Sequence, residues 1–191
     1  MHIGIGFSKA SNSYVAAKEA SLLAKLEAKQ DKIDLAIVFC SIYYNAEEVL
    51  RAVKEILPEA KIAGCSAAGI ILSSGIENQG VAVLGIKSNR VSFGLGVVKD
   101  VSPKEERSKG QDLAKSSLES LGAHKKDVFM MFSDGFIANS SELIRGVQDV
   151  LGKSFPCIGG ASSGDFNLDH TYQFFQTKVL TNSGLVQSCS Q

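Results

Sequence analysis

Short apolar runs alternate with longer segments of helical period along this chain. Four runs rich in β-branched and aromatic residues predict buried strands, namely Ile3 to Phe7, Leu35 to Phe39, Val81 to Ile86 and Val128 to Phe132. Residues 46–57 form one apolar stripe at helical spacing, with Asn45 in the position of an N-cap and Pro58 as the stop. A second such segment follows Asn139 and ends at Gly152. This alternation predicts an α/β fold.

The same order of elements occurs twice. Residues 3–9 match residues 93–99 at a shift of 90, and residues 64–69 match residues 159–164 at a shift of 95. The shift grows steadily along the chain, as a few small insertions would make it. We interpret the chain as two tandem β-α-β-α-β-β repeats, about residues 1–89 and 90–191.

The repeat also predicts how the strands pair. A strand-helix-strand step favours parallel neighbours, and the last strand of each repeat is expected to return antiparallel. We therefore expect a mixed, mostly parallel sheet, or two packed sheets, with pseudo-twofold symmetry. Residues 87–90 leave room only for a tight turn between the repeats, so residues 1–191 are treated as one domain.

Composition narrows the class of function. The 191 residues are 45% hydrophobic, which suffices for a full core. Twenty basic and twenty acidic residues cancel, so no global field attracts nucleic acid or anionic lipid. The first residues do not follow the pattern of a signal peptide, and no apolar run approaches the roughly twenty residues of a membrane helix. We expect a cytoplasmic protein that binds neither nucleic acid nor membrane.

Metal and cofactor patterns are absent from the sequence. Its four cysteines are Cys40, Cys65, Cys157 and Cys189. Their irregular spacing favours reduced thiols over a disulfide framework or a zinc site. Gly4 and Gly6 do not start a dinucleotide fingerprint, because Lys9 occupies the third glycine position. The same pair recurs at Gly94 and Gly96, so close packing of a strand explains both. We expect no metal and no cofactor.

The candidate site lies where strands end. In parallel α/β sheets, ligands collect at the carboxyl ends of strands and at helix N-termini. Residues 40–45 and 133–139 have pocket-like composition there, and the glycine-flanked loops 64–69 and 159–165 can present backbone N–H groups. These glycines could instead serve only tight turns. We predict a ligand site between the repeats, formed by Tyr43, Gly64, Cys65, Ser66, Gly69, Asp134, Gly159, Gly160, Ser162, Asp165 and Tyr172.

The chemistry of these residues suggests a ligand class. A zwitterion needs N–H donors for its carboxylate and an acidic partner for its amine. The two loops offer backbone donors, and Asp134 and Asp165 offer the acid, with Tyr43 or Tyr172 at the rim. An amino acid or a related metabolite is therefore the expected ligand.

Several motifs together resemble one known family. Residues 64–69 are similar to the GCS-x-x-G signature of the FIST N-terminal domain, and residues 158–165 resemble its later IGG-A-x-x-G-D/N segment. Residues 171–174 and 181–186 resemble the stretches that close that domain. The resemblance extends from about Ile3 to about Val186. It implies a non-catalytic sensory domain of signal transduction that binds small ligands such as amino acids. It also implies a FIST C-terminal domain as partner, and an exposed sheet edge could alternatively serve self-association.

Two other functions stay open. Cys65 lies on a glycine-rich loop, where a lowered pKa would make its thiol a nucleophile or a redox sensor. Only His170 could come near it as a base, and a small buried cysteine is the simpler interpretation, under which Cys65→Ser should be nearly neutral. The third possibility is a protein-interaction module without a ligand of its own, built on loops and an uncovered sheet edge.

Overall fold

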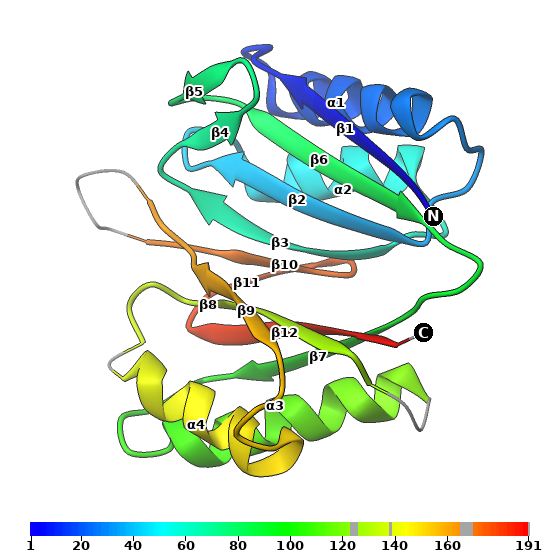
Figure 1. Cartoon of the computed structure of the whole chain (residues 1–191). Coiled ribbons are helices and arrows are strands. Elements are labelled where there is room, and N and C mark those ends of the chain that lie inside the picture. Colours follow the sequence, from blue (N-terminus) through cyan, green and yellow to red (C-terminus); the bar gives the residue numbers. More distant parts are fainter. Residues whose placement is uncertain (123–125, 138, 165–169, 191) are drawn as a thin grey trace.

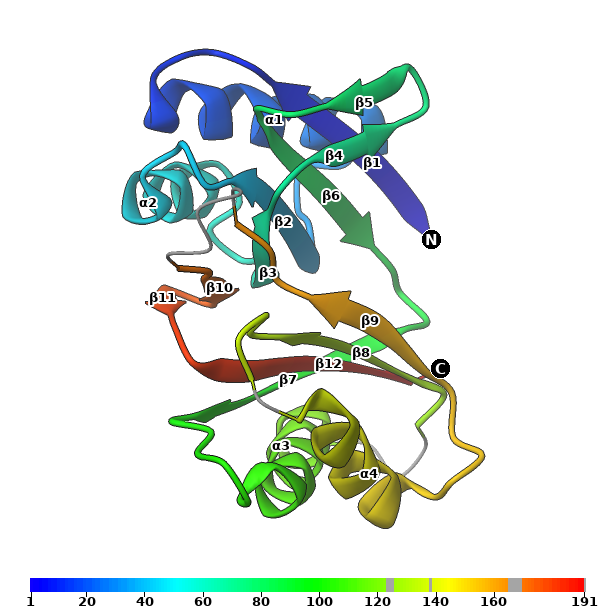
Figure 2. The ribbon, with the colours of Figure 1, turned by 90° about the vertical axis from the view of Figure 1, so that its left-hand side faces the viewer.

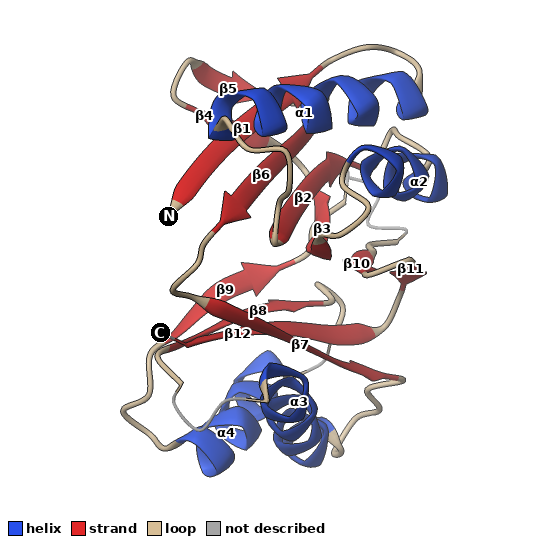
Figure 3. Cartoon of the chain, turned by 90° about the vertical axis from the view of Figure 1, so that its right-hand side faces the viewer, coloured by secondary structure: helices blue, strands red, loops and turns tan. Residues whose placement is uncertain are grey.

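The chain folds into four layers in the order helix pair, sheet, sheet, helix pair, as Figure 1 shows in this computed structural model. The structure describes residues 1–122, 126–137, 139–164 and 170–190. Figure 3 shows the helices as the two outer layers and the strands between them. The two sheets therefore face each other, and each is covered on its outer side by its own pair of helices.

The first sheet has six strands in the order β1-β6-β2-β3-β10-β11. Their bounds are β1 (His2–Ser8), β6 (Val81–Lys87), β2 (Leu35–Ser41), β3 (Lys61–Ala67), β10 (Gln173–Phe175) and β11 (Lys178–Leu180). Helices α1 (Ser13–Ala28) and α2 (Ala46–Ile56) cover its outer face. The hairpin β10–β11 comes from the second half of the chain, so the second half completes the first sheet.

The second sheet has four strands in the order β7-β12-β8-β9. Their bounds are β7 (Ser92–Lys99), β12 (Ser183–Ser190), β8 (Val128–Ser133) and β9 (Cys157–Ala161). Helices α3 (Glu106–Leu121) and α4 (Ser140–Leu151) cover its outer face. A separate two-stranded ribbon is formed by β4 (Ile70–Leu72) and β5 (Gly75–Glu77).

The mixed character of the fold and the alternative of two packed sheets are confirmed, but the expectation of mostly parallel pairing is wrong. Among the described strands, only β2 with β3 and β8 with β9 pair in parallel, and the other pairings are antiparallel. The reason is the position of the returning strands. β6 inserts between β1 and β2, and β12 inserts between β7 and β8. The two strands that flank the first helix of each half are therefore separated by an antiparallel strand.

The predicted helix starts are confirmed by their capping hydrogen bonds. The Asn45 side chain accepts from the Glu48 N–H at 2.9 Å, and α2 begins at the next residue, Ala46. The Asn139 side chain accepts from the Glu142 N–H at 3.2 Å in the same way. Each cap satisfies one of the free N–H groups at a helix start. Each cap therefore fixes the start of a helix a few residues after a strand ends, α2 after β2 and α4 after β8.

The paired glycines of β1 serve close packing, as predicted. A Cβ atom added to Gly4 would lie 2.0 Å from the Ala24 carbonyl oxygen, and one added to Gly6 would lie 1.8 Å from that of Ala20. The backbone of α1 therefore sits directly on β1. In the second half, Gly94 lies in the same way against α3. No dinucleotide motif is needed to explain either pair.

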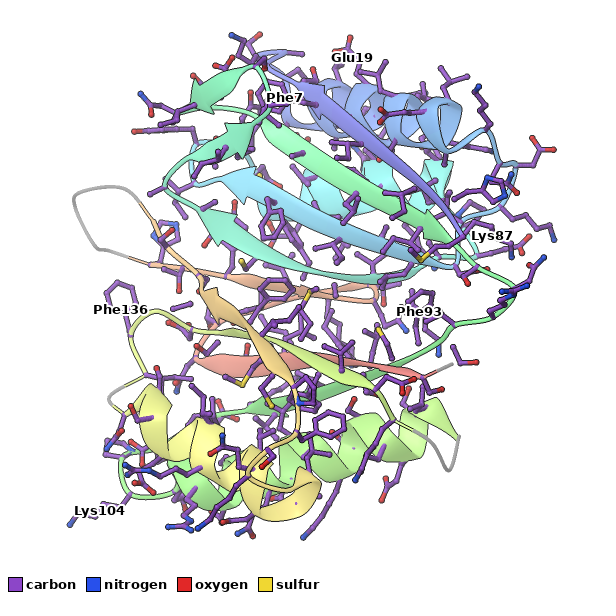
Figure 4. The ribbon with its side chains drawn as sticks, in the orientation of Figure 1. Phe7, Glu19, Lys87, Phe93, Lys104 and Phe136 are labelled. Atoms are coloured by element: carbon purple, nitrogen blue, oxygen red, sulfur yellow. The ribbon has the colours of Figure 1, made fainter. Side chains whose placement is uncertain are left out.

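An apolar interior joins the two sheets. Its buried members are Leu35, Ile37, Ala63, Cys65, Phe93, Leu95, Phe132 and Leu185. The rings of Phe39 and Phe132 meet edge to face across the two sheets, with centroids 5.6 Å apart. Figure 4 shows the Phe93 side chain pointing into the space between the sheets. No helix in the described part of the chain is long and apolar enough to cross a membrane.

Candidate functional site

A cleft of about 700 Å³ opens where both parallel strand pairs end. Most of its lining residues end or follow β2, β3, β8 and β9, while Asn78 follows β5 and Thr171 precedes β10. These strand ends lie at the edge of the molecule that faces the viewer in Figure 2. The lining residues are Ile42, Tyr43, Ala67, Ala68, Asn78, Gly135, Phe136, Ala161, Ser162, Ser163, Gly164 and Thr171. Figure 4 shows the Phe136 side chain at this edge. The two halves of the chain thus build one concave surface together.

The sequence-predicted residues divide between two neighbouring hollows. Tyr43 and Ser162 line the larger cleft. Five others line an adjacent hollow of about 380 Å³, namely Cys65, Ser66, Gly69, Gly159 and Gly160. The structure therefore brings most of the predicted residues to one region, although not around one cavity. Asp165 lies outside the described residues.

Gly64 and Gly159 serve strand packing. Gly64 has a φ of +149°, and a Cβ atom there would lie 1.9 Å from the Val38 carbonyl oxygen of β2. Gly159 has a φ of +142°, and its Cβ atom would lie 1.8 Å from the Met131 carbonyl oxygen of β8. A side chain at either place would push the parallel strands apart. Of the two interpretations open for these glycines, packing accounts for both.

The segments predicted as glycine-flanked loops are largely strand, because residues 64–67 belong to β3 and residues 159–161 belong to β9. The ends of these two strands are tied to each other. The Ser163 N–H donates to the Ser66 carbonyl oxygen at 3.1 Å, and the Ala68 N–H donates to the Ser163 hydroxyl at 2.9 Å. The Ser66 N–H donates to the Tyr172 carbonyl oxygen at 2.9 Å. These N–H groups are therefore used within the protein, and they hold the cleft in shape instead of forming an open anion nest.

Asp134 lies behind the cleft wall and is buried. Its Oδ1 accepts from the Thr171 hydroxyl at 2.9 Å and from the Phe136 N–H at 2.8 Å, and its Oδ2 accepts from the Asn182 N–H at 2.7 Å. Hydrogen bonds to a charged acceptor are strong, and together they replace the water that burial removes. Asp134 thus organises three loop segments around the cleft.

A buried polar network continues from Asp134 across the molecule. The Ser162 hydroxyl donates to the Thr171 hydroxyl at 2.9 Å, and the Gln173 side-chain amide donates to the Ser162 hydroxyl at 2.7 Å. The Ser183 hydroxyl in turn donates to the Gln173 side-chain oxygen. Gln173 belongs to the first sheet, whereas Ser183 belongs to the second. The sequence marks Thr171 and Gln173 only as part of a family motif, so their place in this network was not predicted.

Tyr172 does not lie at a rim. Its ring is buried in the core of the first half, where it meets Phe174 edge to face at 5.4 Å between centroids. Its hydroxyl donates to the Ser41 carbonyl oxygen at 3.4 Å, and burial raises the pKa of this phenol well above its usual range. Tyr43 remains the tyrosine whose ring is exposed at the cleft.

Cys65 is a buried thiol and not an activated one. It belongs to the apolar interior between the sheets, and burial raises its pKa to about 12. The thiol is therefore protonated at neutral pH, whereas a reactive cysteine needs a lowered pKa. The described residues that line the larger cleft carry no formal charge. The region is suited to holding a small molecule by shape and neutral polar groups.

Comparison with known proteins identifies the family of this site. The family model described as the FIST N domain matches residues 34–187, a range that includes both loops and the buried network. A search of curated proteins finds no match. Among solved structures, the cyanuric acid hydrolase from A. caulinodans is similar at 12% identity, over 99% of this chain and 71% of that chain, with a TM-score of 0.47. A likeness at this TM-score carries no inference about activity.

Proposed function

The chain belongs to the FIST N domain family, which indicates a sensory role in signal transduction, and we propose that it is a non-catalytic domain that binds a small metabolite. The observation that carries the proposal is the cleft of about 700 Å³ at the carboxyl ends of β2, β3, β8 and β9. Small-molecule sites have volumes of this order and favour this edge of parallel strands.

The lining suggests the chemistry of the ligand. Ile42 and Phe136 supply apolar surface, and Tyr43, Asn78 and Ser163 supply hydroxyl and amide groups. Because the carboxylate oxygens of Asp134 already accept hydrogen bonds from the protein, we do not assign this residue to a ligand amine. A small neutral or zwitterionic metabolite fits this lining, and amino acids are the first class to test.

A binding role is also supported by the protonated state of the two buried cysteine thiols. Burial raises the pKa of both Cys40 and Cys65 to about 12, so neither is prepared for nucleophilic attack. We therefore prefer a sensor to a thiol enzyme or a redox sensor. A stable covalent adduct on Cys65, or turnover lost in a Cys65→Ala variant, would reverse this preference.

Thermal-shift screening of amino acids and related carboxylates tests the binding proposal. A ligand at about one hundred times its Kd stabilises the folded state by about 2.7 kcal/mol. For a chain of this length, such a change raises Tm by several degrees.

A variant pair locates the binding. Ala68→Phe should fill the cleft and abolish the shift, because Ala68 is exposed and lines it. Ser11→Phe adds the same ring at an exposed position outside the cleft and should leave the shift unchanged. A response that survives in the Ala68→Phe variant would contradict the assignment to this cleft, and no response to any compound would favour the interaction module.

We further propose that the two halves are diverged tandem copies with pseudo-twofold symmetry, packed as one cytoplasmic domain. The strand orders β1-β6-β2-β3 and β7-β12-β8-β9 support duplication, because both place the returning strand between the first and second strands. The shared interior of Phe39 and Phe132 supports a single domain. Either a C-terminal FIST domain or a second copy would be the macromolecular partner.

A further inference from the structure

Both halves of the chain build the same turn after their second strand. In the first half the Tyr44 N–H donates to the Ser41 carbonyl oxygen at 3.2 Å, and in the second half the Ile137 N–H donates to the Asp134 carbonyl oxygen at 3.3 Å. Each bond joins residues three apart and closes a β-turn. The two bonds correspond at a shift of 93, which is also the shift between the starts of β2 and β8. The turns therefore occupy equivalent places in the two halves.

Each turn directs one aromatic side chain outward. The third residue of the turn is Tyr43 in the first half and Phe136 in the second, and these side chains are 65% and 51% exposed. The residues that follow them, Tyr44 and Ile137, are buried in the cores of their own halves. Because a buried side chain and a backbone hydrogen bond hold each turn, the exposed ring is fixed at its base.

The two exposed rings belong to one concave surface. Tyr43 and Phe136 both line the cleft of about 700 Å³, one from each half of the chain. Figure 4 shows the Phe136 ring standing out from the chain after β8. A single exposed aromatic residue is ordinary, whereas apolar side chains gathered at one concave surface mark a place for a partner. The cleft thus offers two aromatic rings to whatever it binds.

The polar groups beside these rings are neutral and available. The Ser163 hydroxyl accepts from the Ala68 N–H at 2.9 Å, and its own hydrogen makes no bond to a described residue. The carboxamide of Asn78 is exposed and has no hydrogen-bond partner among the described residues. It can donate and accept at the same time. The described lining residues carry no formal charge, so nothing in this lining favours a charged ring.

We propose that the ligand of the cleft carries an uncharged aromatic ring, which stacks against Tyr43 and Phe136 and turns its polar groups toward Asn78 and Ser163. Contact between aromatic rings contributes to binding beyond the area that it buries, so a flat ring is preferred to a saturated ring of the same size. This inference rests on the proposed binding function and narrows its ligand class. Such a ring can come from an aromatic amino acid or from the base of a nucleoside.

Calorimetric titration of the whole chain with matched compounds tests the ring. Phenylalanine and cyclohexylalanine have the same carbon skeleton, and only the first has an aromatic ring. If the source is an amino acid, phenylalanine should bind about two- to tenfold more tightly. Adenosine and ribose form the second arm, in which adenosine should bind and ribose should not. The arm that responds identifies the source of the ring.

Substitutions at the two turns test the residues. Tyr43→Leu and Phe136→Leu keep an apolar side chain but remove the ring, and each should weaken binding of the responding compound about two- to tenfold. Tyr43→Phe keeps the ring and should keep the affinity. Tyr14→Leu is the matched control, because Tyr14 lies on α1 outside the cleft, and it should bind as the wild type does. Circular dichroism should be unchanged at both turns, since the replaced side chains are exposed.

The variants also separate this inference from the binding proposal on which it rests. A ligand that is lost in Ala68→Phe but binds equally well after Tyr43→Leu and Phe136→Leu are combined would overturn the ring assignment and keep the cleft as the site. Equal affinity for phenylalanine and cyclohexylalanine, without binding of adenosine, would have the same meaning. A chain that binds none of the amino acids, carboxylates and nucleosides would overturn both proposals.

Discussion

Asp134 shows how an acidic residue near a ligand cleft can serve the fold. Sequence reasoning placed it as a partner for an amine, because it follows a strand and precedes a capped helix. In the structure its two oxygens receive three hydrogen bonds from Thr171, Phe136 and Asn182. These three donors replace the hydration that burial removes from the carboxylate, and the same donors without it would be left unsatisfied.

Asp134→Asn should therefore destabilise the protein by about 2–3 kcal/mol, because the amide removes the charge and turns an NH2 group toward a donor. Chemical denaturation at neutral pH measures the loss. Asp112→Asn is a suitable control, because Asp112 is an exposed aspartate on α3, away from the cleft. A loss at Asp134 below about 0.5 kcal/mol would contradict the structural role.

The expectation that Cys65→Ser is neutral changes once its surroundings are known. Cys65 sits in the apolar interior with Leu35 and Phe132, where a serine hydroxyl would lose its hydration. Cys65→Ser should cost about 1–3 kcal/mol in free energy of unfolding. Cys65→Ala keeps the site apolar and removes one atom, so it should cost less. Equal losses in the two variants would show that the serine hydroxyl finds a partner.

For single residues, the sequence predicted where a residue lies in the fold better than it predicted what its side chain does. It located the ends of the strands, because apolar runs and glycines mark where strands stop, but it took residues 64–67 and 159–161 as loops although they belong to β3 and β9. It did not separate Gly64, which packs on β2, from Gly69, which lines a hollow, because both follow the same local pattern. The burial of Tyr172 depends on β10 crossing to the first sheet, and local periodicity cannot show that step.

Helices α3 and α4 cross at a contact without side chains between them. A Cβ atom on Gly146 would lie 2.0 Å from the Arg107 carbonyl oxygen, and one on Gly110 would lie 2.1 Å from that of Leu143. The helix backbones therefore touch, and the Arg107 guanidinium bonds the Asp149 carboxylate at 2.8 Å beside the crossing. Two glycines in mid-helix are unfavourable for each helix alone, so their place is explained by packing.

Gly146→Ala tests this crossing because helix propensity and packing predict opposite signs. Propensity alone would stabilise the helix by about 1 kcal/mol. The contact with backbone atoms leaves no flexible side chain to move, so we expect a net loss of about 1–3 kcal/mol from forcing the helices apart. Thermal unfolding followed by circular dichroism measures the sign. Gly122→Ala is a control without close contacts, although its φ of +64° carries a separate local strain.

At the scale of elements, the sequence predicted the helices well and the sheets poorly. Helix caps and stops such as Asn45 and Gly152 are local signals, and the structure follows them. The antiparallel return of β6 and β12 was also predicted. Their insertion between neighbouring strands was not, because strand order depends on contacts between residues far apart in the chain. Because of that insertion, the pairing that was expected to be mostly parallel is mostly antiparallel in both sheets.

The whole molecule depends on two kinds of contact between its halves. The hairpin β10–β11 carries residues of the second half into the first sheet, and the Gln173 network joins it to Ser162 and Ser183. The second contact is the apolar interior in which Phe39 meets Phe132. Since each half completes the other, we expect the chain to unfold in one cooperative step.

Phe132→Ala is the test of this cooperativity, because Phe132 is a buried residue of β8 whose ring contacts Phe39 of β2. Removing the ring should cost about 3–5 kcal/mol and lower amide hydrogen-exchange protection equally in β2 and β8. Leu143→Ala is the comparison, since Leu143 is buried between α4 and its own sheet. If unfolding is one global step, each variant should lower hydrogen-exchange protection in both halves, in proportion to the free energy of unfolding that it loses. A Phe132→Ala variant that loses protection in β8 but keeps it in β2 would show that the first half is stable without the second.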